Sequence, residues 1–419
     1  MASLRTLPMP LLTVTLTVGL AAWAWPEDLP PLRTAGIVVG WAACGLLLAS
    51  LLLMVREARL ASLLGGLERM YRWHHYTGML AYLLLLAHPL VLACEAWRTS
   101  PQLAWQVLSP LAQGRPVQVG WLSLLLMMLG LGATLSSRIG YARWRRLHVG
   151  LGLAVLLGLW HLALLGIDEP VWPFMVVAMG LLGWRMLRGD LGLAAHPYVV
   201  GAVDHVGDGM VELTLQPLGR PVLPAAGQFV LVAFFSGANF RGCGEFHPFT
   251  VSARLADGAL RIAVKALGDC TRHIQSIETG VMARVQGGFG AFLSDRPPGP
   301  QLWVAGGIGI APFLAVLREG PLSQPTDLLY LYRHDADAAY LAELAAIAAG
   351  QPQLSLHALA TGDDPSSDLS GLLAGTRCRH PVEAYLCGPP GLVAALEGVL
   401  RARGIGARHI HCDNFGFRP

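Results

Sequence analysis

Six long apolar segments fill the first 190 residues, and they limit the possible fold more than any other feature of the chain. Each has roughly the 17 to 25 residues that a helix needs to cross a hydrocarbon core of about 30 Å. Inside a membrane the backbone polar groups must bond within the segment or within a closed barrel, and continuous apolar runs of this length predict helices. The predicted spans cover residues 8–25, 35–55, 71–97, 117–135, 147–165 and 171–187.

The composition indicates a membrane half followed by a soluble half. Of the 419 residues, 54% are hydrophobic and 14% are charged, whereas a soluble chain carries about a quarter charged residues. The small net charge of +3, without basic runs, argues against nucleic-acid binding. The seven cysteines include no CxxC pair, which fits a reduced, cytosolic soluble half better than a disulfide framework or a zinc site.

Arginines are divided unevenly between the two sides of the predicted membrane. The loops after the second and fourth segments are rich in arginine, and the positive-inside tendency makes that side cytoplasmic, together with the N-terminus and everything after the sixth segment. The first segment has features of a secretory signal, but this charge pattern favours its retention. The arginine-rich loops contain Arg56, Arg59, Arg69, Arg72, Arg138, Arg143, Arg145 and Arg146, and the opposite loops contain Arg33, Arg98 and Arg115.

Histidines occur in pairs on two of the segments. His74 and His88 are fourteen residues apart in the third segment, and His148 and His161 are thirteen apart in the fifth. At 1.5 Å per residue these spacings are about 21 and 20 Å, so each helix holds one histidine near the inner surface and one toward the outer. Because the two helices run in the same direction, His74 is level with His148, and His88 with His161.

Two imidazoles that face each other across a helix bundle are the usual way to hold a six-coordinate haem. A hydrogen-bonded packing residue is the ordinary alternative for one histidine, but four at matching depths favour two haems. The two histidines of the fifth segment do not share one helix face, because thirteen residues separate His148 from His161 by about 140° around an ideal helix. Either the fifth segment bends near its glycines, or the two haems approach it from different sides.

From about residue 196 the pattern changes to short alternating segments. GMVELTLQPL, QFVLVAF and ALRIAVKAL are separated by Gly, Pro and Asp, which predicts strands of a small antiparallel barrel over residues 196–296. The segments HPFTVSA, VKALGDCT and VQGGFGAF lie within it. Each of these motifs is weak when it is taken singly.

Residues 297–419 show strands that alternate with helices, which predicts a parallel α/β sheet. The stretch QLWVAGGIGIAPF combines a buried strand, a glycine turn and a helix with Pro312 near its first position. Glycines at such a turn let backbone N–H groups approach a phosphate at the helix N-terminus. The third glycine of the GxGxxG fingerprint is absent, so the motif is a loose dinucleotide signal.

These motifs, in this order, resemble the ferric reductase and NADPH oxidase superfamily. The resemblance covers essentially the whole chain and rests on H-x13-H, H-x12-H, HPFT, a KxLGDxT-like stretch, GGIGIAPF and CGPPG. It implies a six-helix transmembrane bundle with two haem b groups over residues 1–190. An FAD-binding antiparallel β-barrel over 196–296 and a Rossmann-like NADPH-binding α/β domain over 297–419 follow. The implied location is a bacterial inner membrane, with both soluble domains in the cytoplasm.

The superfamily binds flavin through its HPFT segment. The resemblance implies that His247 and Pro248 shape the flavin site, that Phe249 lies by the isoalloxazine and that Thr250 hydrogen-bonds near N5. A surface histidine and a barrel-core aromatic residue are the ordinary alternatives for His247 and Phe249. The stretch beside the FAD phosphates corresponds to Lys265, Gly268 and Thr271.

The resemblance also assigns the nucleotide contacts. Arg333 directly follows the strand LLYLY, where a partner for the NADPH 2′-phosphate is expected and an NAD-preferring site usually has an acid. This favours NADPH over NADH, with a solvated arginine as the alternative. The pyrophosphate loop corresponds to Gly306, Gly307, Gly309 and Pro312, and the turn beside the nicotinamide to Cys387, Gly388 and Pro389.

A C-terminal aromatic residue stacks on the flavin in this superfamily until nicotinamide displaces it. The ending DNFGFRP offers Phe415 and Phe417, of which we favour Phe415. Thr250, Cys387 and Phe415 are therefore the expected catalytic contacts. His75, offset from His74 by about 100° on a helix, is expected at the interface or near a haem propionate rather than on iron.

The order of the predicted parts describes an electron path. Hydride transfer from NADPH delivers two electrons at once, a haem accepts one, and a flavin connects the two. We expect electrons to pass from NADPH through FAD and the two haems to a small molecule outside the membrane. A ferric chelate is the first expectation, dioxygen, which would give superoxide, is the second, and a quinone or a periplasmic redox protein is a further alternative. A non-catalytic membrane haem protein is the rival class, against which the flavin and nicotinamide motifs argue; the sequence identifies no accessory protein.

Overall fold

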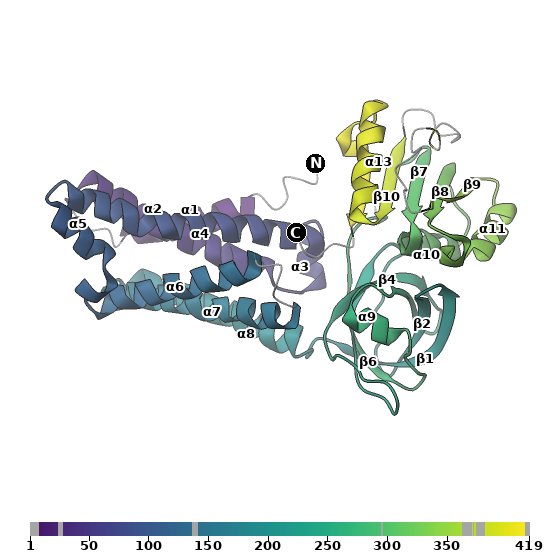
Figure 1. Cartoon of the computed structure of the whole chain (residues 1–419), viewed down its shortest axis with the longest axis horizontal. Helices are drawn as coiled ribbons and strands as arrows, with labels where there is room; N and C mark the ends of the chain where they lie inside the picture. Colours follow the sequence, from purple (N-terminus) through teal and green to yellow (C-terminus); the bar gives the residue numbers. More distant parts are fainter. Residues whose placement is uncertain are drawn as a thin grey trace. The chain divides into compact units, whose positions relative to one another are not determined.

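The computed structural model describes residues 8–23, 28–135, 141–294, 296–362, 371, 373 and 382–414. The chain divides into two compact units, Met1–Leu191 and Gly192–Pro419 (Figure 1). In the described residues the first unit is helical, and the second contains a barrel and a sheet. The limits expected for the three domains stay predictions.

The helices of the first unit follow the apolar segments of the sequence. Among the described residues, α2, α4, α6 and α7 are long and apolar enough to cross a membrane. The helices α1 and α8 coincide with the first and last predicted spans, but they have only 16 and 17 residues. Helix length and composition thus support four of the six predicted spans. The helices are α1 (Pro8–Trp23), α2 (Pro31–Leu53), α3 (Ala58–Leu63), α4 (Leu67–Trp97), α5 (Pro101–Leu108), α6 (Arg115–Leu135), α7 (Tyr141–Leu164) and α8 (Asp168–Trp184).

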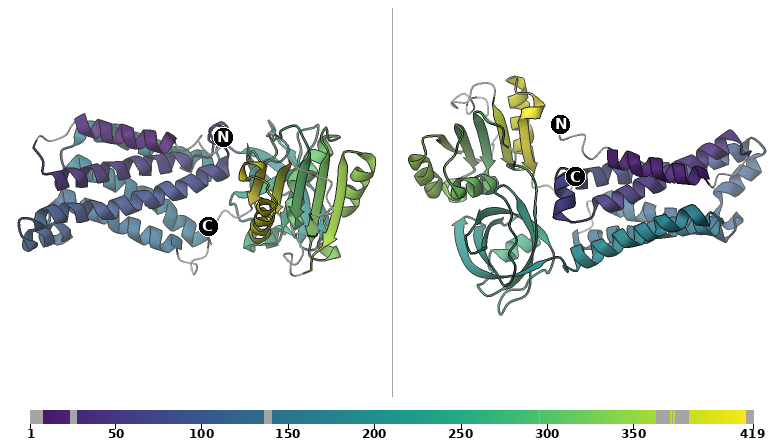
Figure 2. Two further views of the ribbon diagram at one scale, coloured as in Figure 1. Left: turned by 90° about the horizontal axis from the view of Figure 1, so that it is seen from above. Right: turned by 180° about the vertical axis from the view of Figure 1, so that it is seen from behind.

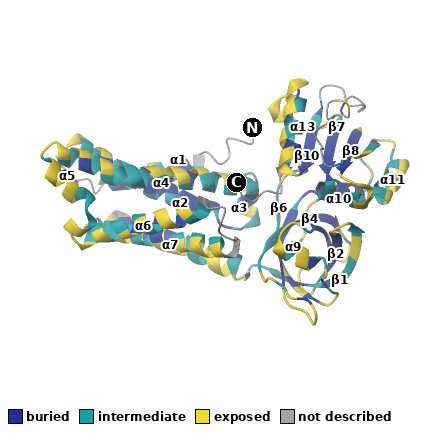
Figure 3. Ribbon diagram, in the orientation of Figure 1, coloured by how far each residue is buried: buried dark blue, intermediate teal, exposed yellow. Residues whose placement is uncertain are grey.

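Two long helix pairs build this unit. The helix α2 packs along α4, and α6 packs along α7, while α1 adds to the first pair and α8 to the second (Figures 1 and 2). Trp41 and Phe174 meet in the core with their ring centroids 5.9 Å apart. Large apolar side chains such as Leu83, Leu129 and Val176 are exposed. Figure 3 shows exposed positions along the helices of this unit. Apolar surface of this extent is unfavourable in water, so these faces fit hydrocarbon.

The second unit begins with a closed antiparallel barrel whose strand order is β1-β2-β5-β4-β3-β6. Alternate residues of each strand face inward, as Val211, Leu213 and Leu215 do from β2, because successive side chains point to opposite faces. The short helix α9 (Asp269–Ile274) lies across one end of the barrel (Figures 1 and 2). The predicted antiparallel barrel is confirmed. Its strands are β1 (His196–Gly207), β2 (Met210–Pro217), β3 (Phe229–Phe234), β4 (His247–Arg254), β5 (Leu260–Lys265) and β6 (Met282–Phe289).

A parallel sheet with the order β11-β10-β7-β8-β9 follows the barrel. Side chains of β7 alternate between the two faces: Trp303 packs toward α10 and α11, and Val304 packs toward α13. The predicted parallel α/β sheet is confirmed. Its elements are β7 (Gln301–Gly306), α10 (Ala311–Glu319), β8 (Thr326–Tyr332), α11 (Leu341–Gly350), β9 (Leu354–Ala360), β10 (Glu383–Gly388), α13 (Pro390–Ala402) and β11 (Ile410–Asn414).

The strand order places a topological switch point in the middle of the sheet. The chain leaves β7 toward β8 and β9 on one side, and then returns to place β10 and β11 on the other. Ligands of open α/β sheets bind beyond the carboxyl ends of the strands at such a point. The turns that follow β7 and β10 therefore mark the expected nucleotide site.

Arg318 at the end of α10 ties the sheet domain to the barrel. It donates hydrogen bonds at 2.7 Å to Glu212 of β2 and at 2.7 Å to Glu343 of α11. Tyr340 and Ser252 also donate to Glu212, which is only 3% exposed. Burial alone would lower the pKa of Arg318, but the two carboxylates outweigh it and raise that pKa. The buried carboxylate is thus fully engaged between the two domains.

Candidate functional site

His74 in α4 and His148 in α7 lie close to each other. Their ring centroids are 5.9 Å apart, with the ring planes at 77°. Two imidazoles on one metal ion, each bonded at about 2 Å, place their ring centres roughly 6 Å apart. The pair therefore has the spacing that a single iron between the rings requires.

Each of the four membrane histidines has its Nδ1 atom within hydrogen-bond distance of an oxygen, at 2.7 to 3.3 Å. Three of these oxygens are backbone carbonyls, which can only accept, and those of Gly36 and Pro116 place the proton of His88 and His161 on Nδ1. That tautomer leaves the Nε2 lone pair free for a metal, as in most metal-bound histidines. The Nδ1 atom of His74 also lies 2.7 Å from the Ser50 hydroxyl. The partners are Ser50 for His74, Gly36 for His88, Thr134 for His148 and Pro116 for His161.

Glycines on neighbouring helices make room for the outer pair. A Cβ on Gly40 of α2 would lie 3.0 Å from Nδ1 of His88, and one on Gly120 of α6 would lie 3.0 Å from Nδ1 of His161. Both separations are shorter than ordinary van der Waals contact, so a larger residue would push the ring away.

Charged side chains that the sequence reasoning missed lie beside the inner pair. Asp190 is 3.6 Å from Arg56 and 3.6 Å from Arg185. Arg185 interacts electrostatically with both His74 and His148. The guanidinium of Arg185 suits an anionic neighbour, such as the propionate of a haem. No local motif marks these charged side chains, because the fold brings together the ends of separate helices.

The HPFT segment forms the start of β4. His247 and Pro248 are half-buried, whereas Phe249 and Thr250 are only 6% and 7% exposed. The ring of Phe249 belongs to the barrel core, where its centroid lies 6.3 Å from that of Phe234. The structure thus separates the four residues into an accessible pair and a buried pair.

The stretch that the resemblance assigns to the FAD phosphates divides between two places. Thr271 stays at the start of α9, where its Oγ1 accepts a hydrogen bond at 2.8 Å from the N–H of Gly268. Lys265 extends toward the sheet domain: its Nζ lies 3.9 Å from Asp337 and 3.7 Å from where a Cβ on Gly307 would be. Lys265 is therefore beside the glycine turn that follows β7.

The glycines of the two predicted nucleotide turns are in close backbone contact. Gly306 ends β7 and Gly388 ends β10, and a Cβ on Gly388 would lie 3.1 Å from the Cα of Gly306. A Cβ on Gly309 would collide with the carbonyl group of Cys387. Gly307 has a φ of +53°, in the left-handed region that favours glycine. Both turns therefore need glycine, and they meet at the switch point.

The remaining predicted nucleotide residues lie at the same edge of the sheet. Pro312 is the second residue of α10, and Pro389 directly precedes α13. Arg333 follows β8 and is exposed. Cys387 is 1% exposed, so its thiol is part of the sheet core. Phe415, like Phe417, lies outside the described residues.

Two family models match the chain. The model for the ferric reductase like transmembrane component matches residues 39–159, which include His74, His88 and His148. The model for an FAD-binding domain matches residues 196–326, which include the barrel and β7. The chain joins a ferric reductase-like transmembrane domain to a ferredoxin-reductase-type FAD and NAD(P) module. These matches support an integral membrane oxidoreductase of the ferric reductase or FAD/NAD reductase type.

Curated relatives are similar to this ferric reductase-like protein over part of its length. A ferredoxin–NAD(P)+ reductase component of the naphthalene 1,2-dioxygenase/salicylate 5-hydroxylase systems of a Ralstonia species is 29% identical over 235 residues, 52% of this chain and 67% of that one. The corresponding component of the naphthalene 1,2-dioxygenase system of Pseudomonas putida is 31% identical over 217 residues, 47% and 62% of the two chains. The chain thus spans about two thirds or less of these relatives' lengths.

Solved structures also align with the chain. A ferredoxin NADP+ reductase from Neisseria gonorrhoeae with bound FAD and NADP aligns with a TM-score of 0.44 at 18% identity, over 53% of this chain and 99% of that one. A flavohemoglobin from Malassezia yamatoensis with bound FAD and haem has a TM-score of 0.48 at 16% identity, over 92% and 98%.

Proposed function

We propose that the protein is a transmembrane ferric reductase. Six helices cross the membrane, electrons enter from cytoplasmic NADPH through FAD, and two haem b groups carry them to a ferric chelate outside. The observation that supports this most is the facing pair His74 and His148 in a chain that also has an FAD-binding domain. Flavin, when bound, supplies the conversion of two-electron to one-electron transfer.

The membrane histidines hold the two haems in this proposal. His74 and His148 bind the inner iron, and His88 and His161 bind the outer one. The hydrogen bonds at Nδ1 orient each ring and direct Nε2 toward the iron. A haem held by two histidines would have no open position on its iron, so the acceptor would receive electrons without binding to the metal.

Residues of the barrel and the sheet position the flavin and the nucleotide. His247 and Pro248, the accessible pair of HPFT, line the flavin site together with Phe249, and Thr250 hydrogen-bonds near N5. Exposed Arg333 reaches the 2′-phosphate of NADPH, which favours NADPH over NADH. The backbone N–H groups of the glycine turn after β7 hold the pyrophosphate. The nicotinamide lies at the turn after β10, and Phe415 covers the flavin until nicotinamide arrives.

Exposed aromatic and cationic side chains at the end of the bundle that contains α5 support the choice of acceptor. Trp97 is 63% exposed, Trp105 is 72% exposed, and the side chain of Arg98 is 66% exposed. Arg115 begins α6 at the same end. The positive-inside tendency favours an outward position for this end, where cationic side chains attract an anionic chelate but give no advantage to uncharged dioxygen.

Anaerobic stopped-flow spectroscopy tests the acceptor. Protein reduced with NADPH should be reoxidised faster by ferric citrate than by dioxygen at equal concentration. Arg98→Glu should slow the reaction with ferric citrate and leave the reaction with dioxygen unchanged, and Arg401→Glu, at an exposed site in α13, is the matched charge control. Faster reoxidation by dioxygen in the unmodified protein would identify an oxidase instead.

A further inference from the structure

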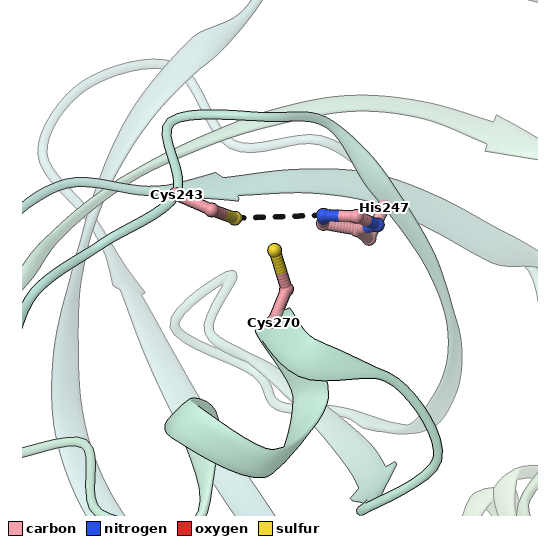
Figure 4. Close-up of side chains that lie close together, drawn as sticks. All are labelled: Cys243, His247 and Cys270. Carbon is pink, nitrogen blue, oxygen red and sulfur yellow. Dashed lines mark hydrogen bonds between the residues drawn. The ribbon is translucent and has the colours of Figure 1, made fainter. Parts of the chain in front are cut away.

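Cys243, His247 and Cys270 form a compact group beside α9 (Figure 4). Cys243 lies in the loop between β3 and β4, His247 is the first residue of β4, and Cys270 is the second residue of α9. The Sγ of Cys243 is 3.4 Å from Nε2 of His247, and the three potential ligand atoms lie within 4.8 Å of one another. In Figure 4 the Cys270 thiol points toward the space between the other two side chains.

These distances are close to those of a tetrahedral zinc site. Bonds of about 2.3 Å to sulfur and 2.0 Å to nitrogen place neighbouring ligand atoms roughly 3.5 to 3.8 Å apart. The sulfur–nitrogen distance of 3.4 Å already meets this. A separation at the 4.8 Å limit would have to shorten by about 1 Å. Cys243 is exposed, which leaves its side chain room to make this adjustment.

The kinds of ligand also select the ion. Two thiolates and an imidazole favour zinc over magnesium or calcium, which prefer oxygen. Cys243 is exposed, so the fourth position opens to solvent and a water molecule can complete the tetrahedron. Binding releases one proton from each thiol, and the two thiolates then balance the charge of the ion. The cluster thus needs no further protein ligand.

The geometry points to a Zn²⁺ site at Cys243, His247 and Cys270 whose occupancy excludes FAD. The competition rests on the proposed function, in which His247 lines the flavin site, and on the family resemblance, which implies that Gly268 and Thr271 lie beside the FAD phosphates. Nε2 of His247 bonds to the ion in the zinc-bound state and is then lost to the flavin site. Cys270 lies inside the phosphate stretch, between Gly268 and Thr271, so zinc also fixes α9. Zinc therefore holds the flavin-free protein in a state that does not load FAD.

Metal binding is tested with the flavin-free, full-length protein, which is kept in solution by detergent and reduced by a reagent that contains no thiol. Co²⁺ serves as the probe, because thiolate coordination gives charge-transfer bands that carboxylate or imidazole sites lack. One equivalent should produce these bands, and Zn²⁺ should abolish them. Cys243→Ser and Cys270→Ser should each lose the bands, whereas Cys94→Ser, at an exposed cysteine outside the cluster, should retain them. Bands that are absent from the unmodified protein, or unchanged in both cluster variants, would overturn the metal site.

Competition is tested by titrating FAD into the same protein with and without Zn²⁺. Zinc should raise the apparent Kd for FAD at least tenfold in the unmodified protein and should leave it unchanged in Cys243→Ser. Normal FAD binding by Cys243→Ser without zinc shows that this variant is folded. FAD binding that is indifferent to zinc rejects the competition. A protein that binds no FAD under any condition refutes the proposed flavin function, and the cobalt bands then decide the metal site alone.

Discussion

His74 and His75 are adjacent in the sequence, but their surroundings differ. His74 faces His148 and has Ser50 at its Nδ1, whereas the ring of His75 lies 6.0 Å from that of Tyr76. Successive helical residues are about 100° apart, so only one member of the doublet can face α7. The hydrogen-bond partner and the facing ring, rather than the histidine itself, distinguish the proposed ligand.

Removal of single histidines tests this assignment. His74→Ala and His148→Ala should each abolish the same haem, because one axial ligand cannot keep the six-coordinate inner site. His75→Ala should leave both haems bound. Haem content per chain and a spectroscopic redox titration measure these outcomes. Loss of different haems from the first two variants, or of any haem from the third, contradicts the pairing.

Gly120 provides a second test at the outer pair. Gly120→Val should displace the ring of His161 and reduce the content of the outer haem, because overpacking of this kind costs about 1 to 3 kcal/mol. Gly132→Val in the same helix is the matched control, since its Cβ would meet nothing within 4 Å. Haem quantification compares the two. Equal losses in both variants would mean that valine disturbs α6 generally.

Arg333 tests nucleotide choice. Arg333→Asp should lower kcat/KM for NADPH by roughly 10- to 100-fold, because a hydrogen bond between charged groups contributes about 1.5 to 3 kcal/mol. The kcat/KM for NADH should change little, since NADH lacks the 2′-phosphate. Steady-state kinetics with each nucleotide provide the comparison. An equal decrease for both would reject the 2′-phosphate role.

At the scale of helices and strands, the sequence predicts the type of element well and the contacts between elements poorly. Apolar runs mark the helices of the bundle, because a membrane span is a continuous local pattern. The short α3 and α5 lie outside the predicted spans. Arg318 and Glu212 are separated by 106 residues, and only the folded sheet and barrel bring them together. The sequence reasoning likewise found His247 through its motif but missed its approach to Cys270.

The Arg318 network predicts strong coupling between sheet and barrel. Arg318→Leu leaves the buried Glu212 carboxylate without its main cation, which should cost about 3 to 5 kcal/mol of unfolding free energy. The melting transition of the soluble unit should fall by roughly 10 °C. Arg401→Leu, which removes an exposed pair with Glu397, should change it little. Differential scanning calorimetry of the full chain measures the Tm of both variants. Equal decreases in Tm would show that the Arg318 network contributes no more stability than an exposed ion pair.

At the scale of the whole molecule, the division into a membrane unit and a soluble unit follows from composition, because burial in lipid and burial in a water-soluble core need different sequences. The switch point between β7 and β10 could not be predicted with the same ease. Strand order depends on contacts between residues that are far apart in the sequence. The contact between the glycine turns at Gly306 and Gly388 is therefore visible only in the folded structure. Family resemblance supplied that part of the site in advance.

His74 and His88 are fourteen residues apart on α4, or about 21 Å, which is roughly two thirds of a hydrocarbon core of about 30 Å. An electron that moves outward between their levels crosses a similar fraction of the membrane voltage. The full voltage is worth about 2.3 kcal/mol per charge per 100 mV, so an interior-negative membrane favours outward transfer by roughly 1.5 kcal/mol per 100 mV. In the proposed electron path each turnover therefore depolarises the membrane, and the membrane voltage becomes a second driving force for the reaction.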